Sequence, residues 1–162
     1  MKKYKPGGLV ACIVYAAVLG AAAFVLGRVV PKHIFNAEKF PFRTFEREKK
    51  LYSVLGVKKW QNKLPDMSRV FKHIMPAKRL TAQTLSDIPR MVEETCVAEL
   101  THAVLSVLGL GMLWLWPGVG GAIAAAVYIL LGNVPYIIIQ RYNRPRLMRL
   151  AARKAQSGKG TA

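Results

Sequence analysis

The strongest constraint on this chain is a run of 38 residues, 103–140, that contains no formally charged side chain. It is too long for one membrane crossing, because about 20 apolar residues span a bilayer core. The stretch Trp116-Pro117-Gly118-Val119-Gly120-Gly121 interrupts it, and proline with glycine marks turns between helices. Trp114 and Trp116 lie beside the break, as aromatic residues do at membrane interfaces. We therefore predict a helical hairpin over residues 98–116 and 122–140, with Asn133 and Pro135 interrupting its second helix.

A second charge-free stretch, residues 9–27, is 19 residues long and follows Lys2, Lys3 and Lys5. Its length suits one more transmembrane helix. A signal peptide is the alternative interpretation, because Ala21-Ala22-Ala23 has the small residues of a cleavage site. We interpret the stretch as a transmembrane helix that the chain retains.

Charge is concentrated in the other segments. The chain has 25 Lys and Arg against eight Asp and Glu, a net charge of +17, although 52% of its residues are hydrophobic. Disordered basic proteins are poor in apolar residues, and charge without a recognition motif does not support nucleic-acid binding. The segregation predicts an all-α membrane protein, a single integral-membrane domain over residues 1–162. Residues 28–97 would form a basic interfacial segment with short amphipathic helices, and residues 141–162 a basic tail.

The distribution of basic residues also bears on membrane orientation. With three spans, the basic segment and the tail share one side with 22 Lys and Arg, and the N-terminus has three on the other side. The positive-inside rule then places the segment and the tail in the cytoplasm. Lys2, Lys3 and Lys5 before the first helix favour the opposite orientation. We expect the N-terminus outside and the C-terminus inside.

A polar stripe enters the second helix. Its members follow helical spacing and share one face: Thr95, Glu99, His102 and Ser106. Ionisable groups at membrane depth are costly and usually have a role. Histidine exchanges a proton near neutral pH, and a carboxylate one turn away can orient it. We predict His102 as a general base supported by Glu99. The alternative is a polar patch where the helix leaves the bilayer.

Glu99 and His102 also match a Glu-x-x-His metal pair, but such sites need further carboxylates from facing helices. Those would have to fold back from the polar segment: Glu38, Glu46, Glu48 or Asp66. We therefore expect neither a metal nor another cofactor. His33 and His73 lie among lysines and are expected to be solvated.

Two basic motifs are candidate substrate-binding sites. The third helix leaves the membrane through Gln140-Arg141-Tyr142-Asn143-Arg144-Pro145-Arg146, whose arginine forks match phosphates and carboxylates. Pro145 disfavours helical geometry at Arg144 and predicts a turn there. The other motif, residues 57–66, contains Lys59, Trp60 and Lys63. For both motifs the alternative is anchoring to lipid headgroups.

No Gly-x-Ser-x-Gly elbow, phosphate-binding glycine loop or zinc pattern is present in the sequence. Covalent catalysis has no clear nucleophile. A base with a carboxylate and nearby cationic donors suits direct transfer of a group to a substrate hydroxyl.

Three groups of residues carry a resemblance to a known family. They are Val57-Lys58-Lys59-Trp60 with Lys63; Glu94-Thr95 with Ala98-Glu99-Leu100 and His102; and Asn133-Val134-Pro135 followed by Gln140-Arg141-Tyr142-Asn143-Arg144-Pro145-Arg146-Leu147. In these stretches the chain resembles the glycosyl-4,4'-diaponeurosporenoate acyltransferases, small membrane proteins of Gram-positive bacteria that acylate the sugar of a carotenoid pigment. It departs from the family at two places. Ala103 follows the histidine here, whereas the family has an aromatic residue at that position, and the turn Leu64-Pro65-Asp66 also differs.

The resemblance implies an acyltransferase of a bacterial cell membrane. It would move a fatty acyl group from acyl-CoA or an acyl carrier protein to a sugar hydroxyl of a glycolipid or glycosylated isoprenoid. Its expected site residues are His102 and Glu99 for catalysis, and for substrate binding Arg141, Asn143, Arg144, Gln140, Lys59, Trp60, Lys63 and Glu94. Expected partners are membrane lipids, the lipid-linked acceptor and the acyl donor. The alternative is a non-catalytic membrane protein whose basic face binds anionic lipids.

Overall fold

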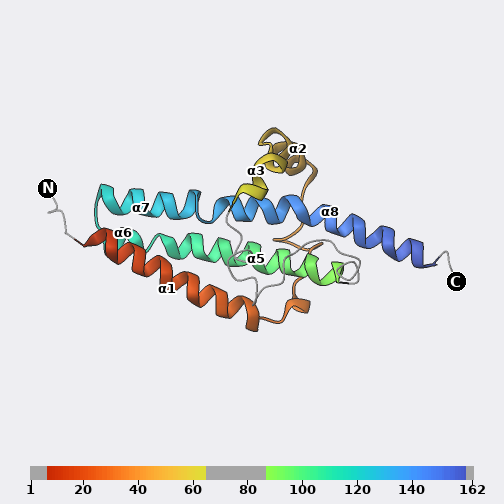
Figure 1. Cartoon of the computed structure of the whole chain (residues 1–162), viewed down its shortest axis with the longest axis horizontal. Coiled ribbons are helices and arrows are strands. Elements are labelled where there is room, and N and C mark those ends of the chain that lie inside the picture. The colour runs from red at the N-terminus through yellow and green to blue at the C-terminus, as the bar shows by residue number, and fades with distance from the viewer. Residues whose placement is uncertain (1–6, 65–86, 160–162) are drawn as a thin grey trace.

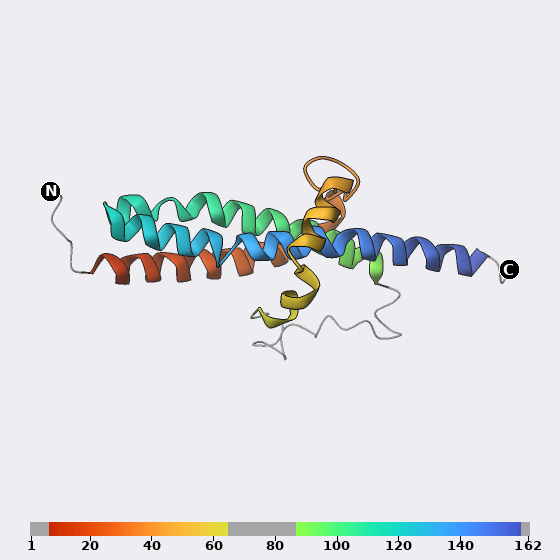
Figure 2. The ribbon, with the colours of Figure 1, turned by 90° about the horizontal axis from the view of Figure 1, so that it is seen from above.

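The computed structural model describes residues 7–64 and 87–159, and within these ranges the chain forms helices and turns without strands. Three helical rods lie side by side (Figures 1 and 2). Each is long and apolar enough to cross a membrane: Gly8–Val29, Ile88–Leu115 and Val119–Lys154. The predicted all-α membrane fold with three spans is confirmed.

The first rod is α1 (Gly8–Val29), which contains an 18-residue stretch with a mean hydropathy of 2.6. It has no charged residue before Arg28 in its last turn, where a cation is favourable beside the free carbonyls. Gly8 lies close against the hairpin, because a Cβ there would lie 2.4 Å from the Trp116 ring. A small residue at this position therefore lets α1 meet the hairpin turn.

The predicted hairpin is confirmed, but its helices are longer than predicted. The first arm is α5 (Ile88–Gly109) continued by α6 (Met112–Leu115). It starts ten residues before the predicted position, because Pro89 fits the first turn of a helix and the charged residues that follow remain helical. Gly118, with φ +110°, makes the turn that leads into the second arm.

The second arm is α7 (Val119–Leu130) followed by α8 (Val134–Lys159). The predicted interruption is present: Pro135 is the second residue of α8, where its missing N–H costs no hydrogen bond. The predicted turn at Arg144 is wrong. Pro145 lies inside α8 and the helix continues through it, because the neighbouring contacts of α8 with α5 hold the helix in place.

The basic segment contains the expected short helices, η1 (Lys32–Ile34), α2 (Glu46–Val54), α3 (Val57–Trp60) and η2 (Gln61–Lys63). Figure 1 shows α2 and α3 stacked against the middle of α8. Gly56, with φ +59°, turns α2 into α3. His33 is exposed, as expected. Asp66 and His73 lie outside the described residues.

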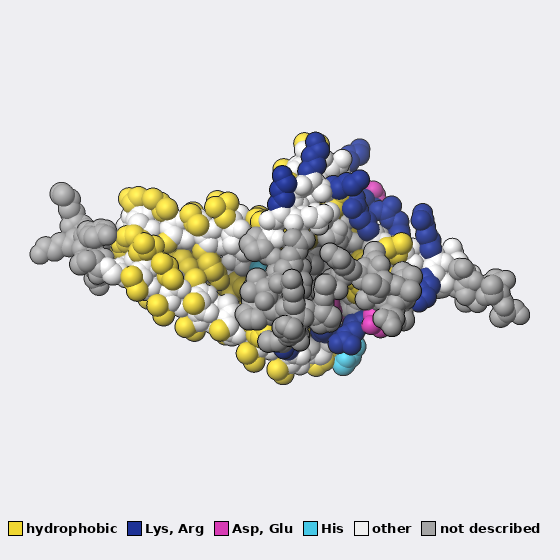
Figure 3. Space-filling view, viewed as in Figure 1, with side chains coloured by type: hydrophobic (Ala, Val, Ile, Leu, Met, Phe, Trp, Pro, Cys, Tyr) yellow, Lys and Arg dark blue, Asp and Glu magenta, His cyan; other side chains and the backbone are white. Residues whose placement is uncertain are grey.

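The described ends of the chain lie at opposite ends of the bundle, with α6 and the hairpin turn near the start of α1 (Figures 1 and 2). Figure 3 shows apolar side chains over α1, α6 and α7, and Lys and Arg side chains gathered around α2, α3 and the end of α8. We call these the apolar end and the basic end. At the apolar end, Cys12, Met112 and Ala125 form a buried core, and the Tyr15 hydroxyl donates to the Leu108 carbonyl at 2.9 Å.

Candidate functional site

A buried group of polar side chains joins α5, α8 and the basic segment. Its members lie at helical spacing on the facing sides of α5 and α8, with one acid added from α2. We call this group the arginine cluster: Glu48, Thr95, Glu99, Arg141 and Arg144. The packing of α5 against α8 places these residues together.

Arg144 is fully buried, with an exposed fraction of 0%. Its guanidinium donates to Glu99 Oε2 at 2.5 Å, to Thr95 Oγ1 at 2.8 Å and to the Thr95 carbonyl at 3.1 Å. A further N–H donates to the Phe42 carbonyl at 2.5 Å, and the Phe42 ring lies 5.6 Å from the guanidinium carbon. Arg144 therefore ties the loop before α2 to α5.

Arg141 lies one turn before Arg144 and reaches the same carboxylate. It donates to Glu99 Oε1 at 2.5 Å and binds Glu48 through two nitrogens at 2.7 and 2.9 Å. Its other two donors reach the carbonyls of Pro41 and Arg43, both at 3.1 Å. All five guanidinium N–H groups are therefore used within the protein.

Two carboxylates and two guanidiniums make the arginine cluster neutral. Buried charges are tolerated when they are paired and hydrogen-bonded, and no described buried side-chain N or O atom lacks a partner. The predicted role of Arg141 and Arg144 in substrate binding stays a prediction. Their contacts give them a structural role, because they hold the basic segment against α5 and α8.

A second polar pair lies on the same face of α5. Nδ1 of His102 lies 3.0 Å from Oδ1 of Asn133, and the Asn133 amide donates to the Tyr128 carbonyl at 2.9 Å. Asn133 is 2% exposed and occupies the break between α7 and α8. The His102 ring stacks on Tyr136 of α8, with centroids 4.8 Å apart and planes 10° apart.

These contacts fix the tautomer of His102. The amide nitrogen of Asn133 must face the Tyr128 carbonyl, which accepts only, so its oxygen faces Nδ1. An oxygen at that position accepts a hydrogen bond, and Nδ1 therefore carries the proton. Nε2 keeps its lone pair and makes no hydrogen bond within the described residues. This is the form of imidazole that accepts a proton from a substrate.

The predicted contact between Glu99 and His102 is wrong. Both carboxylate oxygens of Glu99 bind arginines, and Asn133 orients the histidine instead. Ser106 donates to the His102 backbone carbonyl at 2.8 Å and not to the ring. The polar stripe therefore divides: Thr95 and Glu99 belong to the arginine cluster, and His102 pairs with Asn133.

The other predicted site residues are dispersed over the basic end. Glu94 pairs with Lys32 at 2.7 Å, and Asn143 donates to Gln61 at 3.1 Å. Trp60 donates to the Leu55 carbonyl at 3.0 Å. The remaining three are half-buried Gln140, exposed Lys63 and exposed Lys59. Of these, Lys59 lines a groove beside α8.

Sequence reasoning missed the roles of Asn133, Tyr136 and Glu48. In the sequence, Asn133 belongs to a helix break and to a motif of the family resemblance, and neither names its partner. A buried amide side chain at a break is itself a signal, because its donors and acceptors need partners. Within residues 7–64 and 87–159, no three His, Cys, Asp or Glu side chains group as metal ligands.

The fold and these contacts define a helical membrane protein with a half-buried, oriented imidazole near a basic face. Comparison with known proteins names the class. The family described as glycosyl-4,4'-diaponeurosporenoate acyltransferase matches residues 31–153. Proteins of that name from Staphylococcus aureus are 33% identical (strain MRSA252) and 32% identical (strains bovine RF122 / ET3-1 and USA300), over 93% of this chain and 91% of theirs.

The chain belongs to the glycosyl-4,4'-diaponeurosporenoate acyltransferase family. It is therefore an acyltransferase, and the alternative of a non-catalytic lipid-binding protein is set aside. No solved structure matches it.

Proposed function

We propose that this acyltransferase moves a fatty acyl group onto a sugar hydroxyl of a glycolipid or glycosylated isoprenoid, with Nε2 of His102 as the general base. The observation that carries this proposal is the hydrogen bond between His102 Nδ1 and Asn133 Oδ1, which leaves Nε2 as the unprotonated nitrogen. Stacking on Tyr136 holds the plane of the ring.

The transfer needs one proton acceptor and no covalent intermediate. Nε2 takes the proton of the sugar hydroxyl as its oxygen attacks the acyl carbonyl carbon, and a C–O bond forms. The bond from the carbonyl to the sulfur of a thioester donor then breaks, and the leaving thiolate takes the proton from the imidazolium. The two cysteines in the described residues, Cys12 and Cys96, are buried. Direct transfer therefore fits better than an acyl-enzyme.

The acceptor class follows from the names of the relatives, which specify a glycosylated diaponeurosporenoate. Such an acceptor would place its isoprenoid chain along the apolar end and its sugar beside His102 and Asn133. The donor in this proposal is a thioester, acyl-CoA or acyl carrier protein. Membrane lipids surround the apolar end, and no cofactor takes part.

The basic end faces the cytoplasm of a bacterial cell membrane in this proposal. The 22 Lys and Arg of residues 28–97 and 141–162 support that orientation. Arg141 and Arg144 hold the basic segment in place, with Glu99 between them. Gln140, Asn143, Lys59, Trp60, Lys63 and Glu94 remain the candidates for substrate contact.

The test is acyl transfer by membranes that carry His102→Gln. We expect activity to fall about 100-fold or more, the size of a general-base contribution, while helical content and melting temperature stay near wild type. His33→Gln is the matched control, because His33 is exposed and lies on η1. Wild-type turnover in a folded His102→Gln protein would rule out this base.

A further inference from the structure

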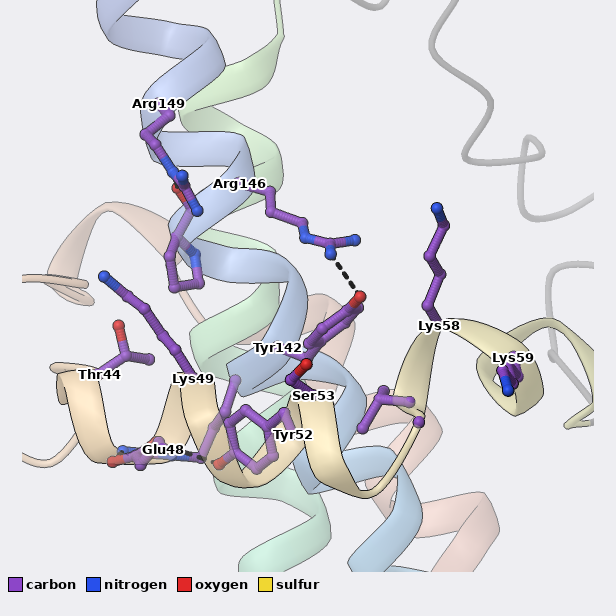
Figure 4. Close-up of a pocket in the computed structure, with 14 residues that line it drawn as sticks. Thr44, Glu48, Lys49, Tyr52, Ser53, Lys58, Lys59, Tyr142, Arg146 and Arg149 are labelled. Atoms are coloured by element: carbon purple, nitrogen blue, oxygen red, sulfur yellow. Dashed lines mark hydrogen bonds and ion pairs between the residues drawn. The ribbon is translucent and has the colours of Figure 1, made fainter.

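A groove of about 370 Å³ lies between α2, α3 and α8, apart from His102 and Asn133. Figure 4 shows its side chains. The lining includes two aromatic rings, Tyr52 and Tyr142, and five cations that are not part of the arginine cluster: Lys49, Lys58, Lys59, Arg146 and Arg149. None of these five cations takes part in the proposed proton transfer, and of the five only Lys59 is among the candidates for substrate contact.

The protein neutralises the charge of this groove only in part. The one carboxylate in its lining, Glu48, is bound to Arg141. Lys49 pairs with Glu46 outside the groove. Among the described residues, no carboxylate forms an ion pair with Lys58 or Arg146. A concave surface with unpaired cations favours an anionic ligand.

The groove is built on fixed elements. Val57, at the start of α3, is fully buried and holds the lysines that follow it beside α8. Arg146 lies over the Tyr142 ring, 3.9 Å from its centroid, and donates to the Tyr142 hydroxyl. Tyr52 packs edge-on against Tyr142, with centroids 6.5 Å apart. Held in this way, Arg146 loses less side-chain entropy when it binds a ligand.

The position of the groove relates it to the base. Tyr136, which stacks on His102, and Arg146 both lie on α8, ten residues apart. At 1.5 Å per residue this is about 15 Å along the helix. The groove is therefore at the basic end, and the base lies toward the apolar end. A donor with a phosphorylated head and a fatty chain has the same arrangement, with its charge at one end and its apolar chain at the other.

We propose that this groove binds the phosphate-bearing end of the acyl donor. The inference rests on the proposed function, because it places the acyl carbonyl toward His102. Lys58 and Arg146 contact the phosphates, and Lys49 and Arg149, which line the same groove, add attraction. Coenzyme A and an anionic phospholipid offer the same phosphate chemistry.

The experiment measures binding without turnover. Purified protein in zwitterionic lipid nanodiscs is titrated with coenzyme A by calorimetry, and in a second arm with spin-labelled phosphatidylglycerol. The test variant is Lys58→Gln/Arg146→Gln. The matched control is Lys50→Gln/Arg153→Gln, which removes the same charge from exposed positions outside the groove. Lys58→Gln alone, at an exposed side chain, serves if the double variant folds poorly.

We expect the groove variant to bind its phosphate ligand about tenfold or more weakly, since it loses two charged contacts with the ligand, and the control to bind like wild type. Loss confined to coenzyme A supports binding of a coenzyme A thioester. Loss confined to phosphatidylglycerol overturns the proposal, because the groove would then bind a lipid headgroup and not the thioester donor. If neither affinity falls, or both double variants fall equally, the proposal is overturned. His102→Gln should bind like wild type, so a failure of the base leaves this result untouched.

Discussion

The two ends of the bundle are held together in different ways. At the apolar end, α1 meets the hairpin through a small core around Cys12, Met112 and Ala125. At the basic end, the arginine cluster joins α5, α8 and the loop before α2 through charged hydrogen bonds. In lipid there is no hydrophobic driving force between apolar helices, so their association depends on close packing. The apolar end therefore depends on shape, and the basic end on satisfied charges.

His102, the proposed base, lies at the boundary between these two kinds of packing. His102 is three residues after Glu99 on α5, about 4.5 Å along the helix. Its partner Asn133 comes from the break between α7 and α8. In the proposed function, a charged acyl donor approaches from the basic end while an apolar acceptor remains in lipid. The predictions below test whether the two ends depend on the interactions described.

The largest expected effect is at the arginine cluster. Glu99→Gln keeps the shape of the side chain and removes the charge that both arginines share. Because Arg144 is fully buried, we expect the free energy of unfolding to fall by about 3–5 kcal/mol. Circular dichroism melting in detergent micelles measures this loss.

Glu38→Gln is the control, because Glu38 is exposed on the same polar side of the molecule. The double variant Glu99→Gln/Arg144→Gln should lose less than the sum of its single changes, since the buried cation is removed together with its partner. Equal melting of Glu99→Gln and Glu38→Gln would show that the cluster does not hold the basic end.

The next effect is on turnover rather than on folding. Asn133→Leu removes the acceptor for His102 Nδ1 and leaves the tautomer unfixed. We expect kcat to fall about 10- to 100-fold, as when a partner that orients a histidine is lost, with KM little changed. Thr101→Val is the matched control, because it loses a hydrogen bond to the Val97 carbonyl on the same helix. An unchanged kcat in Asn133→Leu would remove Asn133 from the mechanism.

Much of this fold could be predicted from sequence. Charge-free stretches of known length fix the number of spans, and the Pro-Gly turn near Trp116 fixes the hairpin. Helix ends were predicted less well. α5 starts within charged residues, and Pro145 remains helical, because contacts between helices outweigh local preference.

The site could be predicted only in part for a similar reason. Helical spacing places Thr95, Glu99 and His102 on one face, but it does not say which neighbour each one contacts. Glu99 was expected beside His102, and the arginines of α8 took its oxygens instead. Such pairing depends on how α5 and α8 are aligned with each other. The residue spacing along a single helix carries no information about that alignment.

The close fit of the apolar end gives the third prediction. In Gly121→Ala, the new Cβ would lie 1.9 Å from the Trp116 carbonyl oxygen. We expect a loss of about 1–3 kcal/mol, typical of overpacking. The control is Gly20→Ala, whose Cβ would meet nothing within 4 Å and should change stability by less than about 0.5 kcal/mol. Similar melting temperatures for the two variants would contradict the view that close packing at Gly121 stabilises the hairpin turn.

The smallest effect concerns the edge of the arginine cluster. The Tyr52 hydroxyl donates to Glu48 at 3.1 Å. Burial, and then the charge and hydrogen bond of Glu48, raise the pKa of Tyr52 from 10.0 to about 12. Because the folded-state pKa is raised, the stability contributed by the neutral phenol is complete below pH 10 and is lost as the pH rises through about 12.

Glu48→Gln should lower the pKa of Tyr52 part of the way toward its usual value, because the charge is removed while burial remains. Phenolate absorbance, taken as the difference from a Tyr52→Phe protein, follows this titration. Glu46→Gln is the control on the same helix, since Glu46 bonds to Lys49 and its side chain is 84% exposed. If both variants titrate alike, Tyr52 responds to the general charge of the basic end and not to Glu48. The phenol would then report on that end as a whole, and the link from α2 through Glu48 to Arg141 would carry less of its stability than the contacts indicate.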